Sequence, residues 1–142
     1  MIPCFQVILT KNLSVLKKIF FFLALFWTGI ITFLCLIKSS NIPQVNIQNL
    51  DKVVHAFFHF VFTSLWFLFF RKQFSNFKIS KLLIISVGFS LFFGILIEIL
   101  QELCTTTRHA DVFDVLANFS GATLAVLVIM LLNKYNKLDT FN

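Results

Sequence analysis

Three clusters of polar side chains in this 142-residue sequence contain the groups that could bind a ligand or transfer protons. In the first, Asp51, His55 and His59 follow one another at steps of four, so on a helix they lie along one face. Two imidazoles at this spacing could bind a metal ion together with Glu98 or an aspartate. Because the glutamate of a His-Glu-x-x-His motif is missing, we assign no metal site from the spacing. His59 is interpreted as a hydrogen-bonding residue between helices.

The second cluster consists of Glu98, Gln101 and Glu102, which share one side of a helix at steps of three and four. Two roles are open for Glu98. It could form an ion pair with Arg108 that fixes its helix against the following connection, or it could take part in chemistry, because ionisable groups inside membrane spans commonly mark a functional interior.

The third cluster comprises Asp111, Asp114, Asn118 and Gly121, again at steps of three and four. The two aspartates lie at the expected start of a helix, where carboxylates accept hydrogen bonds from free N–H groups and favour the positive end of the dipole. Asn118 and Gly121 are residue types that pack helices closely in membranes. Asn118 and Gly121 follow the two aspartates on the same helix face, and this alignment favours a role for both residues in a site.

The elements that carry these clusters are membrane-spanning helices. Hydrophobic residues make up 58% of the chain and charged residues 13%, against roughly 45–50% and 25% in an average soluble domain. Four stretches lack lysine and arginine for about the length of a bilayer crossing. The sequence therefore predicts an all-α integral membrane four-helix bundle with a cytoplasmic segment at 1–18, a four-span domain at 19–132 and a cytoplasmic tail at 133–142. The expected spans are 19–37, 53–70, 82–100 and 115–132.

Basic residues predict the orientation of the bundle, because lysine and arginine are retained on the cytoplasmic side. Of the twelve, nine lie in the N-terminal segment, the second connection and the tail, and three lie in the first and third connections. Both termini are therefore expected in the cytoplasm. The net charge of +6 is accounted for by these flanking residues, so we expect no nucleic-acid partner.

All three polar clusters then fall in one layer on the extracytoplasmic side, which contains five of the six acids. Arg108, His55 and His59 could balance part of that negative charge, as groups removed from water require. A stripe of small residues, Ser86, Ser90 and Gly94, leads from this layer toward the cytoplasm and predicts close packing of a neighbouring helix. We expect a polar pocket that opens to the outside or to the outer leaflet.

The order Asp51-Lys52-x-x-His55, Glu98-x-x-Gln101 and Arg108-x-x-Asp111-x-x-Asp114-x-x-x-Asn118-x-x-Gly121 resembles the VanZ-like family of small membrane proteins, over about residues 49–125. The resemblance implies a compact membrane domain in the bacterial cytoplasmic membrane, and its namesake is associated with low-level teicoplanin resistance. The ligand-binding residues that it implies are Asp51, His55, Glu98, Gln101, Arg108, Asp111, Asp114 and Asn118.

Three functions remain open from the sequence. The first is an envelope accessory protein that binds membrane lipids or a lipid-linked envelope precursor through a site of mixed charge. The second is a membrane-embedded hydrolase or transferase with His55, Glu98 and Asp114 as catalytic candidates, although no known nucleophile motif is present. The third is a proton or ion relay, for which the inner halves of the spans offer few polar residues. The sequence identifies no cofactor.

Overall fold

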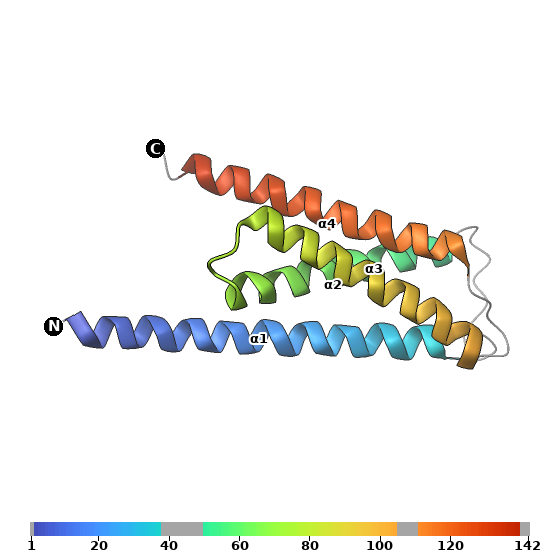
Figure 1. Ribbon diagram of the computed structural model, residues 1–142, viewed down its shortest axis with the longest axis horizontal. Coiled ribbons are helices and arrows are strands. Elements are labelled where there is room, and N and C mark those ends of the chain that lie inside the picture. Colours follow the sequence, from blue (N-terminus) through green and yellow to red (C-terminus); the bar gives the residue numbers. More distant parts are fainter. Residues whose placement is uncertain (1, 38–49, 105–110, 140–142) are drawn as a thin grey trace.

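The chain folds into long helices. The computed structural model describes residues 2–37, 50–104 and 111–139, and their side chains over 14–37, 50–104 and 111–135. Within these ranges the structure contains four helices and no strand (Figure 1). They are α1 (Ile2–Leu36), α2 (Leu50–Gln73), α3 (Ile79–Cys104) and α4 (Val112–Asp139).

Each helix contains a segment long and apolar enough to cross a membrane, which confirms the four expected spans. The segments are Ser14–Leu36, Leu50–Gln73, Ile79–Cys104 and Val112–Tyr135, each a few residues longer than the corresponding expected span. Helix α1 begins at Ile2, so the segment before its apolar part is helical as well. The chain is thus a multi-pass membrane protein by the length and composition of its helices.

Helices α2 and α3 lie between α1 and α4 (Figure 1). The N-terminal end of α1, the turn between α2 and α3, and the C-terminal end of α4 lie at one end of the bundle, on the left of the view. The ends that carry the three polar clusters, namely the start of α2, the end of α3 and the start of α4, lie together at the other end. The expectation that the clusters share one layer is confirmed.

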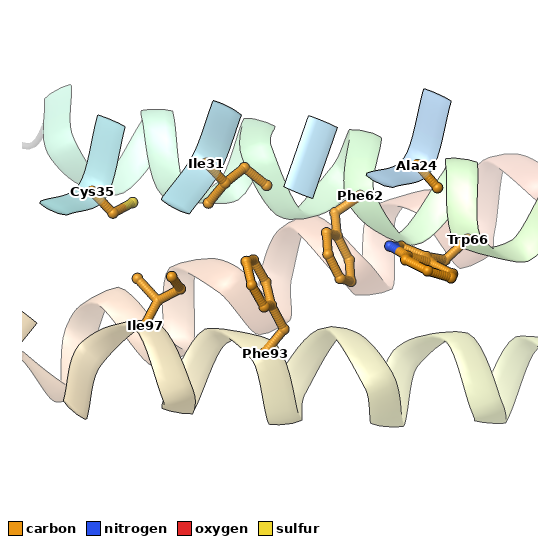
Figure 2. Packing of buried hydrophobic residues seen from close by; sticks show 7 residues of the cluster. All are labelled: Ala24, Ile31, Cys35, Phe62, Trp66, Phe93 and Ile97. Atoms are coloured by element: carbon orange, nitrogen blue, oxygen red, sulfur yellow. The ribbon is translucent and has the colours of Figure 1, made fainter. Parts of the chain in front are cut away.

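Aromatic and aliphatic side chains fill the contact between α1, α2 and α3. Phe62 of α2 and Phe93 of α3 stack with ring centroids 4.7 Å apart and planes 4° apart. Figure 2 shows these rings between the helices, with Ile31 on α1 and Trp66 on α2 beside them. The indole Nε1 of Trp66 donates to Thr28 Oγ1 at 3.3 Å, so α1 is attached to α2 by a hydrogen bond as well as by packing.

Small residues bring α2, α3 and α4 much closer together. A Cβ atom placed on Gly121 of α4 would lie 1.9 Å from the carbonyl oxygen of Ala56 on α2, so the two backbones are in contact. On α3, Ser86, Ser90 and Gly94 are buried, as the stripe of small residues predicted. This close approach allows short polar side chains at the end of the bundle to reach one another across helices.

Candidate functional site

Lys52 joins the starts of α2 and α4. Its ammonium group donates to Asp111 Oδ2 and, at 2.5 Å, to Asp114 Oδ1. The Asp114 side chain is almost fully buried, whereas those of Lys52 and Asp111 are partly exposed. A lysine on the first turn of α2 is therefore shared between one buried carboxylate and one partly exposed carboxylate at the start of α4.

His55 lies one turn deeper, surrounded by acceptors on three helices. Its Nδ1 atom is 3.2 Å from Asn118 Oδ1, which can only accept a hydrogen bond, so Nδ1 carries the proton. Its Nε2 atom is 3.9 Å from a carboxylate oxygen of Asp51 and 3.9 Å from one of Asp114. The imidazole is only 3% exposed. Its orientation is thus set by Asn118, and its second nitrogen faces two carboxylates.

Glu98 brings the end of α3 into the same cluster. Its Oε2 accepts a hydrogen bond from the backbone N–H of Asp111 at 3.1 Å. Its Oε1 is 4.0 Å from His55 Nδ1 and, among the described residues, has no hydrogen-bond partner. Glu98 is buried, so this oxygen is a desolvated acceptor within the site.

Asp111 caps helix α4, as expected from its position. Its Oδ1 accepts from the backbone N–H of Phe113 at 2.8 Å, which satisfies one of the free N–H groups of the first turn. The hydrogen bond from Lys52, together with that from Phe113, lowers the pKa of this carboxyl below its ordinary value of 3.8. Asp114, the other capping candidate, instead directs its carboxylate toward Lys52 and His55.

A second polar contact lies one turn deeper than His55. His59 Nδ1 is 2.8 Å from Ser90 Oγ, which confirms the interpretation of His59 as a hydrogen-bonding residue between helices. A Cβ atom on Gly94 would lie 3.1 Å from His59 Cε1 and 2.9 Å from Asn118 Nδ2. Because Gly94 has no side chain, the side chains of His59 and Asn118 can both lie against this part of α3.

Gln101 is buried but faces another helix. Its Nε2 donates to the carbonyl oxygen of Cys35 at 2.9 Å. Cys35 lies in the last turn of α1, where carbonyl groups have no acceptor role within the helix. The contact therefore ties α3 to the end of α1, a structural role in addition to the ligand-binding role implied by the resemblance.

The structure thus brings Asp51, His55, Glu98, Asp111, Asp114 and Asn118 together. Arg108, and with it the expected ion pair to Glu98, lies outside the described residues. The ligand-binding residues implied by the resemblance do not include Lys52, although it stands in the first quoted motif and, like Arg108, its charge suits contact with a phosphate group. The sequence signal for Lys52 is its separation of three residues from His55, because this step places Lys52 and His55 next to each other on one helix face.

No protein-family model, curated protein or solved structure matches this chain. The chemistry of the site is therefore inferred from its own side chains. Four carboxylates surround one lysine and one imidazole within the described part of the cluster, which leaves an excess of negative charge. Such a site can accept hydrogen bonds from amines and hydroxyl groups, attract a cation, or move a proton through the imidazole.

Proposed function

We propose that this chain is a VanZ-like multi-pass protein of the bacterial cytoplasmic membrane whose polar cluster binds the headgroup of a lipid or of a lipid-linked envelope precursor. In this proposal it acts as an envelope accessory protein. Its resemblance to the VanZ-like family further suggests that it affects the susceptibility of the cell to glycopeptides. The observation that carries the proposal is the meeting of groups of both charges from three helices at one end of an apolar bundle.

The distribution of basic residues supports a position of the cluster outside the cytoplasm. The bundle end opposite the cluster carries Lys17 and Lys18 on α1, Arg71 and Lys72 on α2, and Lys134 on α4. Lysine and arginine are retained on the cytoplasmic side of spans, so this end is assigned to the cytoplasm and the cluster to the opposite side.

An apolar groove beside the cluster supports a lipid as the ligand. The groove has a volume of about 380 Å³ and runs between α2 and α4. Its α2 side starts at Val53, the residue after Lys52, and continues to Phe60. By the rise of a helix this is about 10 Å of apolar surface. A headgroup bound at Lys52 and Asp111 would therefore have room for part of its hydrocarbon chain directly below. The lining residues are Val53, Ala56, Phe57, Phe60, Ser120, Gly121 and Leu124.

Thermal unfolding of the full chain in detergent tests this function. A panel of polyprenyl phosphate, phosphatidylethanolamine and phosphatidylglycerol is added, and we expect one class to raise the Tm, because a ligand that binds only the folded state stabilises it. Lys52→Met and Asp114→Asn should abolish the rise. Lys81→Met, which removes a lysine at the opposite bundle end, is the matched control and should retain it. The absence of any rise, or an equal rise in all variants, would refute the proposal.

The orientation has its own test in Cys104, which is exposed at the end of α3 beside the cluster. In a variant with Cys4→Ser and Cys35→Ala, a membrane-impermeant maleimide added to intact cells should label Cys104. Labelling only after the cells are opened would place the cluster on the cytoplasmic side.

The surroundings of His55 favour one alternative, a membrane-embedded hydrolase or transferase acting on the same class of lipid. Its imidazole lies within 4.0 Å of the carboxylates of both Glu98 and Asp114, a suitable arrangement for general acid–base catalysis. Turnover of a lipid-linked substrate that is lost in His55→Ala and Glu98→Gln would favour catalysis over binding. Equal turnover in the variants and the wild type would exclude it.

A further inference from the structure

The carboxylates that face His55 Nε2 are too distant for hydrogen bonds but suitably placed for a shared cation. The nearest oxygens of Asp51 and Asp114 are each 3.9 Å from this nitrogen. One potential donor atom from each of the three residues lies within 4.8 Å of the others. Zinc binds imidazole nitrogen at about 2.0–2.1 Å and carboxylate oxygen at about 2.0–2.2 Å. Two donor atoms that bind the same ion are therefore roughly 3–4 Å apart.

We propose that Asp51, His55 and Asp114 bind a divalent transition-metal cation of the Zn²⁺ class. One imidazole and two carboxylates form a nitrogen and oxygen donor set that suits such an ion. A set of three protein ligands leaves a coordination position for water or for an oxygen of a bound molecule. The site does not depend on lipid binding and does not follow from the His55 and His59 pair considered in the sequence.

The neighbours of His55 orient it for this role. Asn118 Oδ1 accepts a hydrogen bond from the Nδ1–H group of His55, which leaves the lone pair of Nε2 directed toward Asp51 and Asp114. Metal-binding histidines commonly hold their other ring nitrogen in this way. Lys52 binds Oδ1 of Asp114, so the opposite oxygen, Oδ2, remains turned toward the imidazole.

The charge of the cluster points to the same ligand. Four carboxylates, those of Asp51, Glu98, Asp111 and Asp114, surround Lys52 and His55. Glu98, only 4% exposed, keeps one oxygen without a hydrogen-bond partner among the described residues, and this oxygen lies 4.0 Å from His55 Nδ1, the ring nitrogen that faces away from the proposed ion. A divalent cation would offset two of these negative charges in a region removed from water.

Zinc binding to the full chain in detergent tests the site. All variants carry Cys104→Ser, because an exposed thiolate at the same bundle end could bind zinc by itself. After treatment with a chelator, we expect the protein to retain one zinc per chain, as measured by elemental analysis, and to show a rise in Tm with added Zn²⁺. Asp51→Asn should weaken zinc affinity at least tenfold, and since Asp51 is largely exposed, its replacement leaves the packing intact.

His55→Gln and Asp114→Asn should weaken the affinity at least as much, and Glu102→Gln, which removes an exposed carboxylate at the same bundle end, should leave it unchanged. Cobalt substitution gives a second readout, because visible absorption bands of bound Co²⁺ should be present in the wild type and lost in Asp51→Asn. Failure to bind zinc, or equal zinc binding by Asp51→Asn and Glu102→Gln, would overturn the proposal.

Discussion

Helix α2 presents two faces with different chemistry to its neighbouring helices. Toward α1 and α3 it presents large rings, and the contact is made by side chains such as Phe62 stacked on Phe93. Toward α4 it presents Ala56, whose carbonyl lies against Gly121, and the polar residues Lys52 and His55. The contact of α2 with α1 and α3, the aromatic interface, is therefore built from large rings. The contact of α2 with the start of α4, the polar interface, combines backbones in contact with a few hydrogen bonds.

The difference shows how a small membrane protein can separate packing from chemistry. In the aromatic interface many weak contacts are spread over large surfaces, so the loss of one contact leaves most of the packing in place. In the α2–α4 interface a few directional bonds depend on two backbones in contact. Substitutions in the aromatic interface should alter stability alone, and substitutions in the polar interface should also alter ligand binding.

The largest effect is expected for Gly121→Ala, which forces α2 and α4 apart. The added methyl group would meet the backbone of Ala56, which cannot move aside as a side chain can. We expect a loss of about 3 kcal/mol or more, at the upper end of the cost of overpacking. Denaturant unfolding in detergent measures it. Gly88→Ala, where a Cβ atom would meet no atom within 4 Å, is the control and should be neutral or slightly stabilising. Similar losses in both variants would contradict the backbone contact.

Asn118→Leu should have the next largest effect, because it replaces a polar side chain by an apolar one of similar volume. His55 Nδ1 loses its acceptor in a buried site. We expect a loss of about 1–2 kcal/mol in unfolding free energy, together with weaker lipid and zinc responses. Unchanged responses would show that Asn118 does not orient the imidazole.

Phe62→Leu is expected to cost about 1 kcal/mol, since it removes one stacked ring while retaining an apolar side chain. The thermal response to lipid and the zinc affinity should equal those of the wild type. A loss of either response would break the distinction between the two interfaces.

The smallest effect is expected for Asp111→Asn at neutral pH, because asparagine caps a helix as well as aspartate does. Only the ion pair with Lys52 is lost. The pKa of Asp111 is lowered, so its ionised form contributes to stability above pH 3.8, and this contribution is lost as the pH falls through the lowered value. The Tm of the wild type and the variant should therefore begin to converge as the pH falls below 3.8 and should coincide only below the lowered pKa of Asp111. A difference that stays constant as the pH falls would contradict the ion pair.

Much of the fold could be predicted from the sequence, because lipid imposes simple rules on length and hydrophobicity. The four spans followed from apolar stretches, and the close packing of α3 followed from Ser86, Ser90 and Gly94. The shared layer of the clusters followed from the alternating direction of successive spans. These inferences use only order along the chain and helical periodicity.

The contacts within the site could not be predicted in the same way, since they depend on the rotation and separation of the helices. Periodicity placed Glu98 near the layer but did not show that it accepts from the N–H of Asp111. It did not distinguish Gln101, which reaches Cys35 on α1, from the residues that face His55. The bridge from Lys52 to Asp114 needs the close approach that Gly121 allows.

An experimental structure of the chain purified with its native lipids tests the central claim most directly. We expect the side chains of His55, Glu98 and Asp114 to converge, and density for a headgroup within hydrogen-bond distance of Lys52 or Asp111, about 2.7–3.2 Å. That density should continue into the groove between α2 and α4. Side chains that point away from one another, or lipids bound only to other faces of the bundle, would contradict the account.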